Sequence, residues 1–301
     1  MSKQQQARRD GDDDAGSRTQ RLPEECLAMA ICLTSPADAC RAAVVSAAFR
    51  SAADSDAVWE RFLPPDCDAI QERAVHLVDA SSKKELFMDL SDEHILLDDG
   101  KMSFGLQRTN GAKCYMLSQT ELGIDWINVD LYWRKRSDPD SRFSKVAELL
   151  SVCWFGVSGS ISSKELSTGT HYAGYLVFKL TNGASGLASP SQHSLVKVNG
   201  QMVGNLHTVS LHPCDRAHCG LGDDKTVPHD HEKDDYGGAV VVVRYPRQRA
   251  DGWMELEMGD FHTGDGAHTQ EDDINVILRE YDELRWKKGL IVEGIEIRPR
   301  N

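Results

Sequence analysis

The sequence predicts an α+β chain in which a small helical region precedes an antiparallel β sandwich of jelly-roll type. Apolar residues recur at helical spacing between residues 22 and 66. From Lys84 the apolar spacing changes to every second residue, which is typical of half-buried strands. The segment His171–Leu180 is apolar on both faces, so it should lie between two layers with a substantial core.

Residues 1–20 are almost entirely polar, which predicts a disordered tail. The helical region follows at residues 21–66, where Pro23 suits the first turn of a helix and Glu24 complements its positive end. This helix has two apolar faces, one made of Leu27 and Ile31 and the other of Cys26, Met29, Ala30 and Leu33. So short a region cannot bury both faces by itself, so the second should contact either the following domain or a separate protein.

Further helices are expected in the same region. Ser35 and Asp38 have the spacing of a capping box, and helical character continues over residues 42–49. Ser55 or Asp56 should cap a last helix that ends before Pro64.

Residues 67–83 are expected to form a linker, and residues 84–301 the sandwich domain. Asp98, Asp99 and Gly100 form a hairpin-turn signal. The predicted strands are 102–106, 147–161, 171–180, 194–198, 202–211, 239–245, 253–258 and the first part of 272–286.

Composition excludes several classes of function. A net charge of -13 argues against nucleic-acid binding, because phosphates need a basic face. The polar N-terminus has no secretory apolar segment, and the longest aliphatic run, residues 239–243, is too short to cross a membrane. The eight cysteines follow no disulfide spacing, so reduced thiols in the cytoplasm and nucleus are expected.

Trp126 and Trp133 are the candidate binding residues, because they lie in a segment whose polarity is too high for a core. An indole face can stack on the apolar face of a sugar while neighbouring polar groups bind its hydroxyls. The alternative is that both side chains are scaffold that covers an edge of the sandwich.

Metal binding and catalysis are not expected. The Cys and His residues between Cys214 and His231 lack the spacing of a zinc site. The 212–236 loop that contains them is expected to be mobile, metal-free and without a cofactor. The segment Gly156–Ser160 lacks the final glycine of a nucleophile elbow. Glu255 and Glu257 are spaced like a pair of glycosidase carboxylates, but a solvated strand face is the better interpretation.

The C-terminal part of the chain resembles the plant phloem protein 2 family, the Nictaba-type lectins, over about residues 84–300. The matching segments are Ile124-x-Trp126, Tyr132-Trp133, Ser141–Phe143, Val146–Leu149, Cys153-Trp154, Tyr175–Leu180, Asp251–Glu255 and Gly289–Pro299. The resemblance implies a carbohydrate site that contains Trp126, Trp133, Asp273 and Glu280. The family has glycine after the first tryptophan, whereas Ile127 stands there in this chain.

The helical region resembles an F-box, the module that docks on the Skp-type adaptor of cullin–RING ubiquitin ligases. The resemblance rests on Leu22–Cys26, Ser35–Cys40, Val45-Ser46, Phe49-Arg50 and Val58-Trp59. It implies adaptor contacts by Leu22, Pro23, Glu24, Cys26, Pro36, Val45, Phe49 and Trp59.

Together the two resemblances imply a non-catalytic adaptor of a Skp–cullin–F-box ligase, whose sandwich selects a glycan or glycoprotein target. The alternative is a free-standing lectin or interaction module whose F-box-like segment is only a helical cap.

Overall fold

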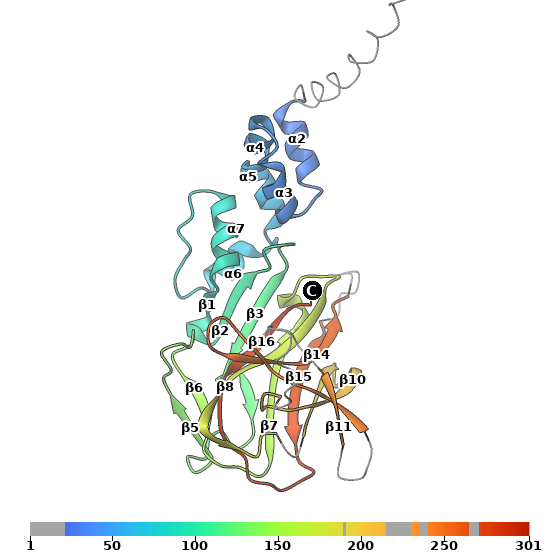
Figure 1. Ribbon diagram of the computed structural model, residues 1–301. Coiled ribbons are helices and arrows are strands. Elements are labelled where there is room, and N and C mark those ends of the chain that lie inside the picture. The colour runs from blue at the N-terminus through green and yellow to red at the C-terminus, as the bar shows by residue number, and fades with distance from the viewer. Residues whose placement is uncertain (1–21, 189–190, 215–229, 235–239, 265–270, 301) are drawn as a thin grey trace, which may run out of the picture. The chain divides into compact units, whose positions relative to one another are not determined.

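The computed structural model describes residues 22–188, 191–214, 230–234, 240–264 and 271–300 (Figure 1). The chain divides into two compact units. The helical unit consists of Met1–Gln71, Leu77–Glu93 and Leu106–Gly111, and the sandwich unit of Glu72–His76, His94–Gly105 and Ala112–Asn301. The predicted tail at residues 1–20 lies outside the described residues, as does most of the 212–236 loop.

The helical unit is built from short helices. They are α2 (Glu24–Ile31), α3 (Pro36–Ala42), α4 (Ala47–Ala53), α5 (Asp56–Phe62), α6 (Cys67–Glu72, whose last residue is grouped with the sandwich unit) and α7 (Lys83–Asp92). The Ser35 hydroxyl accepts the Asp38 N–H at 3.2 Å, so the predicted cap is confirmed. The helix expected over residues 42–49 is interrupted, because Ser46 is extended and its hydroxyl caps α4 at the Phe49 N–H.

Trp59 forms the centre of the helical unit. Its ring packs against Phe62 and Phe87, at centroid distances of 5.6 and 5.2 Å. Its indole N–H donates to the Ala53 carbonyl, so the one polar atom of this buried side chain is satisfied.

Helix α7 corrects the expectation of strand spacing from Lys84. Ser82 accepts the Glu85 N–H as an N-cap, and Leu86, Phe87 and Leu90 share the buried face. A cap followed by this spacing is a helical pattern. The strand spacing begins instead at β1 (Ile95–Leu97), which pairs with β2 (Met102–Leu106) across the predicted turn at Asp98–Gly100.

In the part of the sandwich unit that the structure describes, the strands form two sheets, and their pairings are antiparallel except between β10 and β12. The first sheet has the order β1-β2-β3-β16-β8-β14-β13, with β6 also on β16 and β5 on β6. Its further strands are β3 (Lys113–Ser118), β5 (Trp133–Arg136), β6 (Val146–Leu149), β8 (His171–Ser185), β13 (Arg247–Gln248), β14 (Met254–His262) and β16 (Lys288–Pro299).

The second sheet has the order β11-β12-β10-β9-β15-β7-β4. Its strands are β4 (Leu122–Ile124), β7 (Phe155–Ser162), β9 (Gln192–Val198), β10 (Gln201–Val209), β11 (Asp230–Asp234), β12 (Val240–Arg244) and β15 (Asp273–Glu280). The two sheets meet closely where glycine faces a side chain. A Cβ on Gly159 would lie 3.2 Å from Ile295, and one on Gly174 would lie 2.8 Å from Val276. The predicted fold class is therefore confirmed.

The single strand expected over residues 147–161 is two strands in different sheets. Strand β6 pairs with β16 in the first sheet, whereas β7 pairs with β15 in the second. Residues 150–154 cross between them, because the main-chain groups of Leu150 and Val152 bond to Tyr132 and Lys287 instead of continuing the ladder. This crossing places Trp154 outside both strands.

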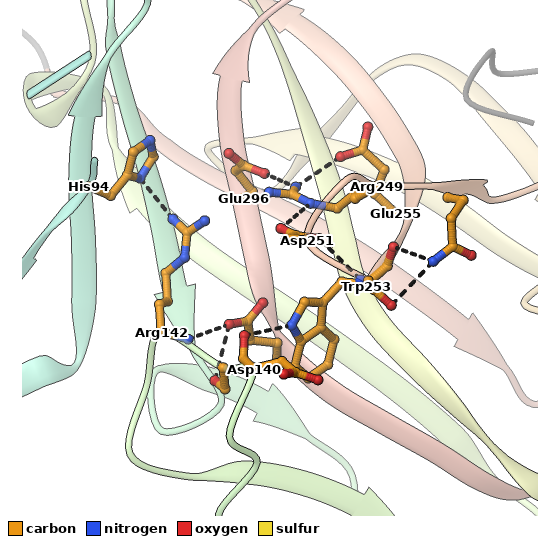
Figure 2. A network of polar contacts seen from close by, with 12 residues as sticks. His94, Asp140, Arg142, Arg249, Asp251, Trp253, Glu255 and Glu296 are labelled. Atoms are coloured by element: carbon orange, nitrogen blue, oxygen red, sulfur yellow. Dashed lines mark hydrogen bonds and ion pairs between the residues drawn. The ribbon is translucent and has the colours of Figure 1, made fainter. Parts of the chain in front are cut away.

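An ionic network lies on the face of the first sheet that points away from the second (Figure 2). Strand β16 directs Ile295 toward Gly159 of the second sheet, so Glu296 points to the opposite side. Arg249 bridges Glu296 and Glu255, and Arg298 also bonds both carboxylates. The expectation that Glu255 lies on a solvated strand face is therefore wrong, because Glu255 is buried among arginines.

Candidate functional site

A cavity of about 560 Å³ opens at one end of the second sheet and is lined by Asp125, Trp126, Trp154 and Tyr281. The lining residues follow β4, precede β7 and follow β15 along the chain. These three strands are neighbours, since Ile124 pairs with Val157 and Glu280 pairs with Phe155. Three segments that are distant in sequence therefore meet at the same end of the sheet. We call this cavity the aromatic pocket.

Trp126 presents its ring through an unusual backbone conformation. It adopts φ 63°, a left-handed value that is uncommon for a bulky residue. The turn is held by the Val129 N–H, which donates to the Trp126 carbonyl at 2.9 Å. Trp126 is 48% exposed. Positive φ thus falls on the tryptophan itself, so Ile127 is not forced into a conformation that favours glycine.

Asp125 supplies the polar side of the aromatic pocket. Its carboxylate accepts a hydrogen bond from the Tyr281 hydroxyl at 2.7 Å, and its N–H donates to the Gly156 carbonyl at 3.0 Å. Burial and the Asp125 contact raise the pKa of Tyr281 to about 12, so the hydroxyl remains a donor at neutral pH. The second carboxylate oxygen can accept bonds from a ligand.

Gly156 lies directly beneath the contact between Asp125 and Tyr281. A Cβ at this position would lie 2.4 Å from the Asp125 carboxylate and 2.5 Å from the Tyr281 hydroxyl. A larger residue would therefore displace both groups.

Trp133 differs from the expectation, because it is buried and not exposed. Strand β5 carries it, and its indole N–H donates to the Asp125 carbonyl at 2.9 Å. The side chain therefore supports the turn beneath Trp126. Sequence polarity misled here because the neighbours Arg134 and Lys135 are exposed while Trp133 itself points inward.

The two predicted acidic residues do not converge on the aromatic pocket. Asp273 and Glu280 are the first and last residues of β15, so they lie at opposite ends of that strand. Asp273 is exposed beside Asn199, whereas Glu280 is buried and paired with Lys287. Only Trp126 of the four predicted residues lines the cavity.

Trp154 and Tyr281 line the pocket without having been assigned a role from the sequence. Trp154 precedes the inward alternation of Phe155, Val157 and Ile161, and its position just outside that pattern was the available signal. Tyr281 follows the last residue of β15, and no local pattern marks it.

The arrangement can bind a ligand but offers no evident acid–base pair. Two indoles and a phenol provide apolar faces, and one carboxylate provides a hydrogen-bond acceptor. This is the chemistry that holds a sugar ring by stacking and by its hydroxyls.

The helical unit has an exposed apolar surface on and beside α2 and α3. Leu27 and Ile31 are buried, whereas the other face of α2 remains exposed. The large exposed apolar side chains on α2 and on the segments beside α2 and α3 are Leu22, Met29, Leu33, Val44 and Val45. We call these five the apolar helical surface.

The predicted adaptor residues divide by burial. Leu22, Pro23, Glu24, Cys26 and Val45 are exposed, and Phe49 is half-buried. Pro36 and Trp59 are buried, so in this structure they support the helices and do not form the surface. Met29, Leu33 and Val44 were not among the predicted contacts, although the first two belong to the apolar face noted in the sequence.

Among the described residues there is no group of three or more His, Cys, Asp or Glu side chains arranged to hold a metal ion. In the same part of the chain, no helix has the length and apolarity needed to cross a membrane.

Comparisons with known proteins match both units. A family model for phloem protein 2 matches residues 112–299, and one for the F-box domain matches residues 20–61. The chain is 40% identical over 279 residues to Putative F-box protein PP2-B2 of Arabidopsis thaliana, which covers 92% of this chain and 82% of the relative. F-box protein VBF from the same organism is 35% identical over 291 residues, which cover 93% of this chain and 99% of the relative.

Among solved structures, a family 35 carbohydrate binding module from Clostridium thermocellum aligns with 62% of this chain and 98% of that module. The identity is 9% and the TM-score is 0.29, too distant a similarity to support an inference. The family matches cover most of the chain. The chain therefore belongs to the phloem protein 2 family, as an F-box protein that carries a lectin-like phloem protein 2 domain.

Proposed function

We propose that the protein is a non-catalytic substrate-recognition subunit of a Skp–cullin–F-box ubiquitin ligase, and that its aromatic pocket binds a sugar on the target. The observation that carries the proposal is the convergence of Trp126, Trp154 and Tyr281 around the Asp125 carboxylate. In such a subunit the mechanism is tethering, which raises the effective concentration of a target lysine near the ligase. We place the protein in the cytoplasm and nucleus, where such ligases act.

The apolar helical surface supports the ligase part of the proposal. Leu33 and Val44 are 85% and 79% exposed, an arrangement that suits a separate partner because water contact with such side chains is unfavourable. We expect the full chain to bind a Skp-type adaptor through this surface.

The test is a binding measurement with the purified adaptor at micromolar concentration. Changing Leu22 and Pro23 to alanine should weaken binding by a few kcal/mol, as loss of apolar anchors does. Leu77→Ala is the control, because Leu77 is also an exposed leucine but lies outside α2 to α4. Absence of adaptor binding by the wild type would refute the ligase role and favour a free-standing lectin with a helical cap.

The sugar part of the proposal predicts weak, specific binding. Each aromatic stacking contact contributes about 1 kcal/mol, so one site should have a dissociation constant in the high micromolar to millimolar range. Trp126→Ala or Trp154→Ala should abolish measurable binding of N-acetylglucosamine or galactose oligomers in calorimetry, with an unchanged melting temperature.

Trp286→Ala is the matched control for these variants, because Trp286 is exposed like Trp126 and Trp154 but does not line the cavity. Its affinity should equal that of the wild type. A wild-type protein that binds no glycan would instead indicate that the sandwich recognises protein.

A further inference from the structure

An ion pair between Glu280 and Lys287 lies completely inside the sandwich unit. Lys287 is 0% and Glu280 is 2% exposed. The Lys287 ammonium also donates to the carbonyls of Cys153 and Arg285, at 3.0 and 2.9 Å. The ammonium therefore contacts one carboxylate, through the ion pair, and two main-chain carbonyls. Glu280 in turn accepts the Glu283 N–H at 2.7 Å.

Stability alone does not explain this pair. Removing two charges from water is costly, and well-packed apolar residues of similar volume often stabilise a core as much or more. A buried pair that also bonds main-chain carbonyls can instead specify which segments lie together. The three groups that Lys287 contacts lie on two segments. One segment precedes β7, and the other begins at the last residue of β15 and continues beyond it.

Those two segments are the ones that form walls of the aromatic pocket. Cys153 immediately precedes Trp154, and Glu280 immediately precedes Tyr281. A main-chain bridge supports the same junction, because the N–H groups of Val152 and Lys287 donate to each other's carbonyls at 2.9 and 2.7 Å. Lys287 thus bonds directly to the residue that comes before each of the two aromatic walls.

We propose that Lys287 and Glu280 are positioning residues of the aromatic pocket, which hold Trp154 and Tyr281 at the spacing that a sugar ring requires. The pair acts from beneath the pocket and does not contact the ligand. This proposal rests on the sugar site proposed above, and it assigns Glu280 a role other than that of a sugar ligand.

The test uses two variants of the full chain. Lys287→Met leaves the Glu280 charge buried without its partner, so it should lower the melting temperature as well as the affinity. The double variant Glu280→Leu/Lys287→Met removes both charges while it keeps apolar volume, so its melting temperature should stay close to that of the wild type. Its affinity for N-acetylglucosamine oligomers should nevertheless fall at least tenfold.

Hydrogen exchange gives a readout that does not depend on the sugar. In the double variant the amides of Val152 and Lys287 should exchange at least tenfold faster, because the junction has lost its side-chain support. Val276→Ala is the control for general destabilisation, since Val276 is buried on β15 away from the pocket lining. It should lower the melting temperature without changing the affinity or the exchange of these two amides.

A double variant with wild-type affinity overturns the positioning role, whether or not its exchange is faster. Wild-type exchange in the double variant overturns it as well. If the wild type itself binds no sugar, the proposed function fails, and exchange at Val152 and Lys287 still decides whether the pair orders the two segments.

Discussion

The aromatic pocket and the face of the first sheet that carries the ionic network, here called the ionic face, both combine a tryptophan with buried charges. The two arrangements are opposite. In the pocket, Trp154 is exposed and the ion pair of Glu280 and Lys287 lies buried beside its segment. On the ionic face, Trp253 is buried, and its indole N–H donates to the Asp140 carbonyl at 3.0 Å (Figure 2). The Lys179 ammonium also covers the Trp253 ring, 4.2 Å from its centroid.

The difference shows what makes a tryptophan available for a ligand. The three buried tryptophans, Trp59, Trp133 and Trp253, each donate their indole N–H to a main-chain carbonyl. Within the described residues, the indole N–H of Trp154 makes no such bond, and no cation lies over its ring. A tryptophan whose polar atom and ring face are already satisfied is scaffold, whereas one with both free can bind.

Truncating the two kinds of tryptophan should separate stability from binding most strongly. Trp253→Ala should cost about 3–5 kcal/mol of unfolding free energy, because it empties a packed site. Trp154→Ala should change stability by less than about 0.5 kcal/mol, since Trp154 is 48% exposed and lines an open cavity instead of filling a closed one. Urea unfolding of the full chain measures both, and similar losses for the two variants would remove the distinction.

The ionic face should also make the sandwich unit sensitive to pH. Burial lowers the pKa of His94 to about 4, and the neighbouring Arg142 guanidinium contributes to this shift. The unfolded chain therefore binds more protons than the folded chain between about pH 6.5 and pH 4, so stability falls as the pH falls through that window.

A shift of this size corresponds to about 2 kcal/mol between pH 7 and pH 5. His94→Gln should remove most of this dependence, as judged from urea midpoints at the two pH values. His262→Gln, which changes an exposed histidine, should leave it intact. Titration of Glu296 does not contribute between these two pH values. Burial raises the pKa of Glu296, but Arg298 and Arg249 outweigh that effect and lower it to about 2, so its stabilising effect is lost only below about pH 4.5.

The smallest expected effect concerns the polar contact within the aromatic pocket. Tyr281→Phe keeps the ring but removes the hydrogen bond to Asp125, so sugar affinity should fall by about 1 kcal/mol, or roughly fivefold. Calorimetry measures this change, with Tyr245→Phe as the control outside the cavity lining. An effect as large as that of Trp154→Ala would mean that the carboxylate, and not the stacking surface, dominates binding.

Local patterns in the sequence were enough to predict the fold class and many of its elements. The cap at Ser35, the two apolar faces of α2 and the strand that contains Leu176 and Phe178 all follow from spacings of a few residues. Such patterns are visible in one dimension, because a helix or strand repeats its environment every 3.6 or 2 residues. They also indicated that the helical unit is too small to bury both apolar faces of α2.

The composition of the aromatic pocket was decided by tertiary structure. Asp125, Trp154 and Tyr281 come together because β4, β7 and β15 are neighbours in one sheet, although the chain separates them by up to 156 residues. The same pairing buries Glu280 against Lys287, and the packing of β5 turns Trp133 inward. Burial and partner choice depend on which distant segments meet, and a pattern within one segment contains no information about that.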